Sequence, residues 1–285
     1  MAPQAQLDDI GIRLKPQALR REGKHIRMAN GVVVSKNNGV QTIRLQRPEK
    51  KNALTSAMYA ALVEAFDAGD ADETVGVHAV FGLPGVFCAG NDIGDFLHFA
   101  KTGGMPLEAI LAFLGTLPRI KKPVIAGVDG VAVGVGVTML MHFDLVYASP
   151  NSIFSTPFLD LGLVPEAASS LLMPRIMGDK RAFEMLVLGE PFSAERAREA
   201  GLINEIVPSD SLEEKVIKSA LRLARKPPEA LKVARSLVRG DPAEILARTG
   251  QEAKLFRERL SSPEATEAFQ AFLEKRPPDF SKAKG

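Results

Sequence analysis

The chain has 285 residues, of which 46% are hydrophobic and 25% are charged, and its formal net charge is +2. This is the composition of an ordinary globular protein. The near balance of charge does not support nucleic-acid binding, which usually shows as a strong basic excess on one face. The single cysteine, Cys88, cannot form an internal disulfide, so a reducing, cytoplasmic setting is expected. The longest apolar region, residues 124–141, contains Asp129 and four glycines, so we expect no membrane-spanning helix.

The first predicted elements are a hairpin and a helix. Two β-rich runs, at residues 32–35 and 40–45, flank an Asn-Asn-Gly turn at residues 37–39, which is a strong hairpin signal. Thr55 is a suitable N-cap for a helix over residues 56–68, because apolar side chains recur there at helical spacing.

Strands and helices then alternate. Strands are predicted over residues 77–81, 124–128, 144–148 and 153–154, and a buried helix over residues 135–143. From about residue 166 helical periodicity dominates, interrupted by a short strand over residues 202–207. The predicted helices are 166–177, 180–188, 194–200, 211–225, 229–238, 243–260 and 264–275.

This alternation predicts an α/β core. We divide the chain into three parts. Residues 1–30, which are polar and mixed in charge, form a solvated N-terminal extension, residues 31–208 form the core, and residues 209–285 form an all-helical C-terminal region.

Three segments carry small residues at points where the backbone could approach a ligand closely. They are residues 87–93 (Phe-Cys-Ala-Gly-Asn-Asp-Ile), 129–136 (Asp-Gly-Val-Ala-Val-Gly-Val-Gly) and 156–166 (Thr-Pro-Phe-Leu-Asp-Leu-Gly-Leu-Val-Pro-Glu). Taken singly, each is also explained by a tight turn in close-packed backbone.

Two of these segments together can stabilise an anion. Gly134 and Gly136 allow a sharp bend into the helix that starts near Val135, and the first turn of a helix has unpaired N–H groups and the positive end of the helix dipole. Ala89 and Gly90 supply a second site of close approach at a strand end. Two such donors that converge on one oxygen would make an oxyanion hole.

Five motifs follow one another along most of the chain. They are residues 47–54 (Arg-Pro-Glu-Lys-Lys-Asn-Ala-Leu), the run at 89–93, the glycine-rich opening of the helix at 134–136, residues 200–203 (Ala-Gly-Leu-Ile) and residues 271–277 (Ala-Phe-Leu-Glu-Lys-Arg-Pro). In this order and spacing they resemble the crotonase (enoyl-CoA hydratase/isomerase) superfamily. The resemblance implies a ClpP/crotonase-like spiral of ββα units, a C-terminal helical trimerisation region, and a homotrimer or a dimer of trimers. It also implies an acyl-CoA thioester substrate, with coenzyme A as part of the substrate and no separate cofactor.

The same resemblance implies roles for particular residues. The oxyanion donors would be the backbone N–H groups of Ala89 and Val135, although this valine departs from the glycine common in the family. The adenine and pantetheine path would be lined by Ala89, Gly90, Asn91, Asp92 and Ile93, with Gly134 beside it. The candidates for the coenzyme A phosphates are Lys50 or Lys51, and Lys275; each of these is alternatively a solvated surface lysine.

The acids separate two activities. Enoyl-CoA hydratases are similar to one another in using two glutamates to activate a water, and the matching positions here are Thr138 and Phe158, which cannot act as carboxylate acids or bases. A carboxylate does occur at Glu166, in a Thr-Pro-Phe…Leu-Gly…Pro-Glu…Ser-Ser pattern that resembles peroxisomal-type 3-enoyl-CoA to 2-enoyl-CoA isomerases and their bacterial relatives. That resemblance implies that Glu166 shuttles a proton, with apolar neighbours raising its proton affinity by desolvation. The alternative is that Glu166 only caps the following helix.

Two other functions stay open on the sequence. One is an enoyl-CoA hydratase of fatty-acid β-oxidation that uses other acids, and the other is a non-catalytic CoA-binding scaffold. Asp160 is expected to be exposed and Cys88 to be a buried, inert thiol. The four histidines show no ligand spacing, so no metal site is expected.

Overall fold

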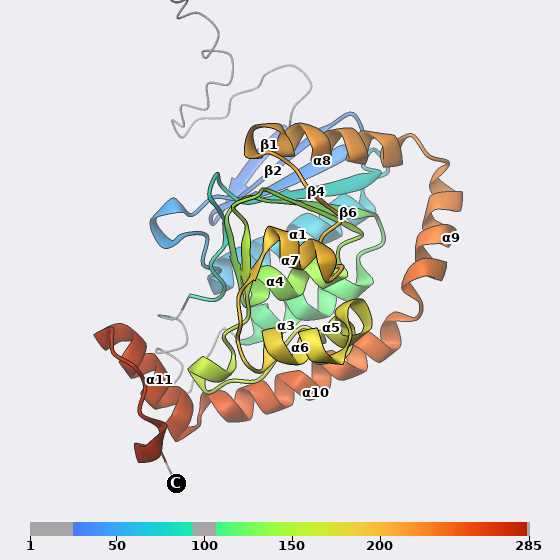
Figure 1. The fold of residues 1–285 in the computed structure, drawn as a ribbon. Coiled ribbons are helices and arrows are strands. Elements are labelled where there is room, and N and C mark those ends of the chain that lie inside the picture. Colours follow the sequence, from blue (N-terminus) through green and yellow to red (C-terminus); the bar gives the residue numbers. More distant parts are fainter. Residues whose placement is uncertain (1–24, 93, 95–106, 284–285) are drawn as a thin grey trace, which may run out of the picture.

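The structure is a computed structural model that describes residues 25–92, 94 and 107–283 (Figure 1). Residues 1–24, and Ile93 of the expected CoA-binding run, lie outside the described residues. The described strands form a seven-stranded and a four-stranded sheet.

The strands of the larger sheet are β1 (His25–Ala29), β2 (Val32–Asn37), β3 (Val40–Leu45), β4 (Val77–Phe81), β6 (Val124–Val128), β8 (Leu145–Ala148) and β11 (Glu205–Ile206). They lie in the order β1-β2-β3-β4-β6-β8-β11, antiparallel from β1 to β3 and parallel from β3 onward. The smaller sheet consists of β5 (Val86–Cys88), β7 (Val131–Val133), β9 (Ile153–Ser155) and β10 (Phe192–Ser193). Its order is β10-β9-β7-β5, and only β10 runs antiparallel to its neighbour.

The helices are α1 (Ser56–Ala71), α3 (Leu107–Thr116), α4 (Val135–Thr138), α5 (Ser169–Met177), α6 (Asp179–Leu186), α7 (Ala194–Glu199), α8 (Ser209–Ala224), α9 (Pro228–Arg239), α10 (Pro242–Leu260) and α11 (Pro263–Glu274). Short 3-10 helices are η2 (Pro48–Lys50), η3 (Leu117–Arg119), η4 (Met139–His142), η5 (Leu159–Leu161) and η6 (Phe280–Lys282). Most predicted helices are confirmed within a few residues. The helix predicted over residues 135–143 is one α-helical turn continued as a 3-10 helix, and the helix predicted from residue 166 begins at Ser169.

Consecutive strands alternate between the two sheets. β4 and β5, β6 and β7, and β8 and β9 each form a pair, in which the first strand joins the larger sheet and the second joins the smaller. Helices α3, α4 and α5 follow these pairs in turn. The predicted α/β spiral of ββα units is therefore confirmed. Because each turn stacks on the one before, the ends of β5 and β7 lie side by side.

The N-terminal hairpin is built on left-handed turn residues. Asn38 and Gly39 have φ angles of 49° and 79°, the conformation that a two-residue turn between twisted strands requires. A second turn of this kind, at Asn30 and Gly31, adds β1 to the edge of the sheet. The prediction that residues 25–29 belong to a solvated extension is therefore wrong, because their backbone pairs with β2 even though side chains such as Ile26 are exposed.

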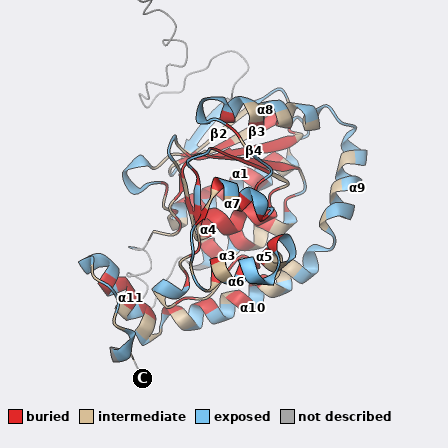
Figure 2. Ribbon diagram, in the orientation of Figure 1, coloured by how far each residue is buried: buried red, intermediate tan, exposed pale blue. Residues whose placement is uncertain are grey.

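The larger sheet is covered on both faces (Figure 2). One face shares the main hydrophobic core with α1, α4 and the smaller sheet. On the other face, Val216 and Ala220 of α8 form a second core cluster with strand residues such as Phe81. The helical region that begins at residue 209 in the sequence therefore starts inside the core, because α8 covers the sheet.

The last helices follow the outside of the body (Figure 1). α9 has no buried residues of its own and joins α8 to α10. α10 packs against α3 and α5, and α11 packs against η5. The C-terminal segment thereby returns to the part of the core that carries the third sequence segment, residues 156–166.

The N-cap of α1 can be tested by substitution. Thr55 Oγ1 accepts a hydrogen bond from Met58 N–H at 3.3 Å. Because Thr55→Ala leaves this N–H without its side-chain acceptor, the free energy of unfolding should fall by about 1 kcal/mol. Thr266→Ala, at an exposed position inside α11, is the control and should change it by less than about 0.5 kcal/mol. Urea unfolding followed by circular dichroism measures both; equal stability of Thr55→Ala and the unaltered chain would contradict the assigned cap.

Candidate active site

The end of β5 is held by the loop at residues 47–54, the first of the sequence motifs. Three backbone hydrogen bonds join the two segments: Ala89 N–H to Lys51 O (3.0 Å), Leu54 N–H to Gly90 O (2.8 Å) and Asp92 N–H to Leu54 O (3.0 Å). The loop therefore acts as a short parallel strand beside residues 89–92. This pairing determines which N–H groups of residues 89–92 donate hydrogen bonds to the loop.

Side chains reinforce the same contact. The buried Asn52 donates to Phe87 O at 3.1 Å and accepts from Arg47 N–H at 2.7 Å. Arg47 Nη1 donates to Asp92 Oδ2 at 2.7 Å. Burial acts to raise the pKa of Asp92, but the Arg47 guanidinium, the Gly94 N–H and the charge of Lys50 together outweigh it, so the pKa lies below its ordinary value. Asp92 therefore orders the loop as a carboxylate.

The assignment of Ala89 N–H as an oxyanion donor is wrong, because that N–H is bonded to Lys51 O. In the bridge to Leu54 the neighbouring Gly90 O and Asp92 N–H point toward the loop, so the intervening Asn91 N–H points the other way. Within the described part of the chain, Asn91 N–H makes no hydrogen bond. The Asn91 side chain is fixed by Tyr59, whose hydroxyl donates to Asn91 Oδ1 at 2.5 Å. Asn91 N–H is thus an open donor of this run.

The second donor lies at the start of α4. Gly134 has φ 54° and ψ −118°, a conformation that favours glycine, and it turns the chain from β7 into the helix. At Gly136 a β-carbon would come within 2.7 Å of Cys88 O, so only glycine lets α4 approach the end of β5 this closely. Among the described residues Val135 N–H has no partner, as expected at a first helical position. Since α4 is a single turn, the N–H group itself matters here more than a helix dipole.

Glu166 is sealed in the core. Glu166 is only 4% exposed, and the Thr138 hydroxyl donates a hydrogen bond to its Oε1. Burial raises the pKa of Glu166 to about 8, the Thr138 hydrogen bond lowers it, and the nearby Glu252 carboxylate raises it again. The expected effect of desolvation is therefore confirmed, and Thr138 is the direct partner of the carboxylate.

Glu166 does not lie in the first turn of a helix. Ala167 and Ala168 follow it with φ angles of 60° and 55°, and α5 begins only at Ser169. The N-terminus of α5 is capped instead by Glu252, which accepts from Ala168 N–H at 2.6 Å and from Ser170 N–H at 3.0 Å. The alternative role of Glu166 as a simple helix cap is thereby excluded.

A cavity of about 380 Å³ lies at these segments. Its described lining combines the two glycine-containing segments with residues of η5 and the C-terminal helices: Ala89, Gly90, Asn91, Val133, Gly134, Pro157, Phe158, Asp160, Leu161, Leu163, Phe256, Ala268, Phe272, Arg276 and Pro278. Glu166 and Val135 are buried and do not line the cavity. Leu163, three residues before Glu166, and Gly134, directly before Val135, do line it. The site is therefore assembled from five parts of the chain.

The three predicted phosphate lysines lie away from this lining. Lys50 and Lys51 are exposed on the loop that holds β5, and Lys275 is exposed at the C-terminus of α11. The cation that does line the cavity is Arg276, which forms ion pairs with Glu267 and Glu274. Sequence reasoning missed Arg276 although it stands beside Lys275, because its place in the site depends on how α11 folds back.

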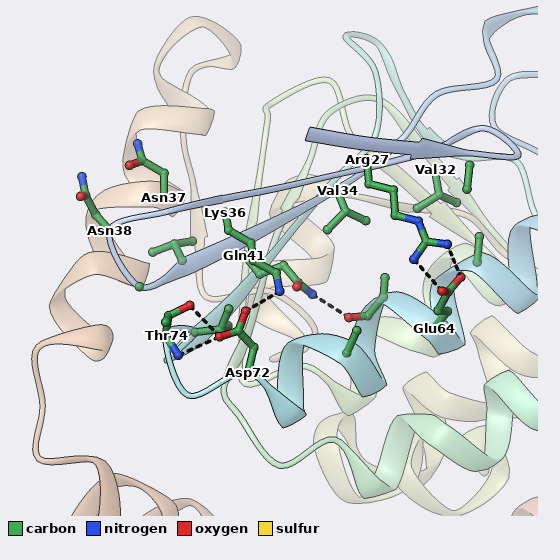
Figure 3. Close-up of a pocket in the computed structure, with 17 residues that line it drawn as sticks. Arg27, Val32, Val34, Lys36, Asn37, Asn38, Gln41, Glu64, Asp72 and Thr74 are labelled. Carbon is green, nitrogen blue, oxygen red and sulfur yellow. Dashed lines mark hydrogen bonds and ion pairs between the residues drawn. The ribbon is translucent and has the colours of Figure 1, made fainter. Parts of the chain in front are cut away.

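A larger cavity, of about 590 Å³, lies between the N-terminal hairpin and α1 (Figure 3). Its charged lining residues form ion pairs, Arg27 with Glu64 and Lys36 with Asp72. None of the predicted site residues lines it. We therefore assign the chemistry to the smaller cavity.

The described residues offer neither a metal site nor a membrane-spanning helix. No group of three or more His, Cys, Asp or Glu side chains within them could hold a metal ion. Likewise no helix in the described ranges is long and apolar enough to span a membrane.

Comparison with known proteins gives the family to which the chain belongs. The family model for enoyl-CoA hydratase/isomerase matches residues 35–283. The chain is 34% identical over 256 residues to enoyl-CoA delta isomerase 2 of Rattus norvegicus, with 87% of this chain and 65% of that protein covered. It is 32% identical over 252 residues to 2,3-dehydroadipyl-CoA hydratase of Escherichia coli K12, with 87% of this chain and 98% of that protein covered. The chain thus spans slightly less than two thirds of the rat isomerase.

Solved structures give the same answer for the fold. An enoyl-CoA hydratase/isomerase from Pseudoalteromonas atlantica T6c is 37% identical and superposes with a TM-score of 0.83, with 88% of this chain and 100% of that one covered. This solved structure therefore shares the architecture of the chain. By the match over nearly its whole length, the chain belongs to the enoyl-CoA hydratase/isomerase family, within the crotonase superfamily.

Proposed function

We propose that this enzyme shifts the double bond of a 3-enoyl-CoA to the 2-position, with Glu166 carrying the proton. The observation that supports this most directly is the buried carboxylate of Glu166, whose pKa burial raises to about 8. A group with a pKa near the working pH can both take and return a proton. The positions where a hydratase would need its two acids hold Thr138 and Phe158.

The reaction begins with removal of a proton from C2. The thioester carbonyl accepts hydrogen bonds from Asn91 N–H and Val135 N–H, which stabilise negative charge on its oxygen. The ionised Glu166 takes the C2 proton, and the electron pair of that bond moves into a dienolate. The resulting carboxylic acid returns the proton to C4, so that the substrate is isomerised and Glu166 is regenerated. A bound acyl group has to extend past the cavity lining at Leu163 to reach the carboxylate.

The remaining features of the proposal follow from the family. Coenzyme A is part of the substrate, and no further cofactor takes part in these steps. We propose that Lys50, Lys51 or Lys275, all of them exposed, contacts its phosphates, and that the chain assembles as a homotrimer or a dimer of trimers through its C-terminal helices. The similarity to a protein named enoyl-CoA delta isomerase 2 supports the choice of isomerisation over hydration.

Replacing the base tests the proposal. Glu166→Gln keeps the shape of the side chain but cannot take a proton, so kcat on a 3-enoyl-CoA should fall by roughly 10²- to 10⁴-fold. The affinity for a CoA ester, measured by calorimetry, should stay unchanged. Full isomerase activity of this variant would contradict the role of Glu166.

The pH dependence has a defined sign. Only the ionised carboxylate can remove the C2 proton, and burial raises the pKa of Glu166 to about 8. The ratio kcat/KM should therefore rise with pH and level off above about pH 8. A ratio that is constant from pH 5 to about pH 9 would show that the group which titrates in the reaction is not this buried carboxylate.

The hydroxyl of Thr138 can be removed without changing the shape of the side chain. Its hydrogen bond lowers the pKa of Glu166, so Thr138→Val should move the rise in kcat/KM to higher pH. Thr138→Ser keeps the hydroxyl and should leave the rise where it is. If both variants behave alike, the hydroxyl does not act on Glu166.

The open alternatives are separated by the choice of substrate. A hydratase would convert a 2-enoyl-CoA to a 3-hydroxyacyl-CoA faster than it isomerises a 3-enoyl-CoA. A scaffold would bind CoA esters tightly and turn over neither compound. Isomerisation that exceeds hydration is the outcome expected here.

A further inference from the structure

The two residues that follow Glu166 adopt a conformation that their sequence does not favour. Ala167 and Ala168 are both fully buried and both left-handed, with φ angles of 60° and 55°. A non-glycine residue in this region is strained, and the conformation persists only where the surroundings hold it. The direction in which Glu166 points therefore depends on groups outside its own segment.

Two buried side chains hold this turn from opposite parts of the chain. His142, in η4, bonds through Nε2 to Ala167 O at 2.8 Å. Glu252, in α10, accepts from Ala168 N–H at 2.6 Å through Oε2. Its other oxygen, Oε1, accepts from Ser170 N–H at 3.0 Å and from Ser170 Oγ at 2.5 Å. One carboxylate thus bonds both to the second left-handed residue and to the start of α5.

Glu252 is unusual for a glutamate on a C-terminal helix. The residue is only 5% exposed and contacts a backbone segment 84 positions earlier in the chain. Arg248, one helical turn before it, donates to Ser170 Oγ at 3.1 Å. Buried carboxylates are costly unless hydrogen-bonded, and Glu252 has three such bonds. Its three hydrogen bonds all go to the turn beside the proposed base and to the start of α5.

We propose that Glu252 is a positioning residue for Glu166, in that its carboxylate clamps the left-handed Ala167–Ala168 turn and thereby fixes the base against Thr138. The inference rests on the proposed function insofar as Glu166 is the base. It adds that α10, a helix that lies outside the spiral core, sets the geometry of the reaction.

The clamp also acts on the charge of the base. Three titratable groups face Glu166 and its turn: Cys88 on β5, His142 on η4 and Glu252 on α10. Burial raises the pKa of Cys88 to about 12 and lowers that of His142 to about 4, so both are neutral near pH 7. Burial also raises the pKa of Glu252, while its hydrogen bonds from Ser170 and Ala168 and the charge of Arg248 lower it. Of the three groups, Glu252 is the one whose charge acts on Glu166. After burial itself, it is the group that raises the pKa of Glu166.

A matched pair of variants tests the clamp. Glu252→Gln keeps the length of the side chain but loses the charge and one of the two acceptor oxygens. It should lower kcat on a 3-enoyl-CoA by ~10- to 100-fold with little change in KM, because the base is displaced rather than the binding cavity. It should also move the rise of kcat with pH to lower pH, because a negative charge near Glu166 is gone.

The control is Glu244→Gln, on the same helix. Glu244 is exposed and bonds to Arg175 of α5 at 2.7 and 2.9 Å, so it joins the same two helices without contacting the turn. This variant should keep the kcat, KM and pH profile of the unaltered enzyme. Glu252→Asp keeps the charge and should restore the position of the pH rise, with kcat only partly recovered. A role limited to helix packing would move none of these pH profiles.

A measurement without substrate separates this inference from the proposed function. Amide hydrogen exchange over residues 166–172 should be faster in Glu252→Gln and unchanged in Glu244→Gln. Unchanged exchange in Glu252→Gln, or an unshifted kcat and pH profile, would overturn the clamp. If the unaltered enzyme turns over no 3-enoyl-CoA, the proposed function fails, and the exchange result still decides whether Glu252 holds the turn.

Discussion

A carboxylate kept out of water is the constraint on which the site depends. Glu166 is 4% exposed, and one hydroxyl, from Thr138, donates to it. Desolvation on this scale favours the protonated form, which is why the pKa rises to about 8. In the proposed reaction, the surrounding packing therefore makes the Glu166 carboxylate a stronger base than an exposed glutamate.

The spiral explains how two backbone donors come to lie together. β5 and β7 are neighbours in the smaller sheet, so the segments that leave them, residues 89–92 and 134–136, meet at one edge. The loop at residues 47–54 then uses the N–H groups of Ala89 and Asp92 and leaves that of Asn91 open. Gly136 allows α4 to approach close enough to complete the pair. The two proposed donors are thus determined by the backbone pairing of residues 47–54 with 89–92 and by the absence of a side chain at Gly136.

Much of this could be predicted from the sequence, since local signals agree with the fold. The Asn-Gly turn, the Thr55 cap and the alternation of strands with helices are encoded within a few residues of where they act. Glu166 could be singled out because it follows a recognisable motif. The assignment of Ala89 as a donor is wrong because hydrogen-bond direction in a strand alternates from residue to residue, and only the partner loop fixes which N–H group is used. Glu252 and Arg276 could not be predicted, because helices far along the chain bring them to the site.

In the proposed reaction one buried carboxylate, that of Glu166, moves a single proton from C2 to C4. The most direct measurement uses a 3-enoyl-CoA labelled with deuterium at C2, with the product examined by mass spectrometry and NMR. Because the protonated Glu166 is shielded from solvent, a measurable share of the deuterium should appear at C4 of the 2-enoyl product. A C4 hydrogen drawn entirely from solvent, or a hydroxylated product, would contradict the account.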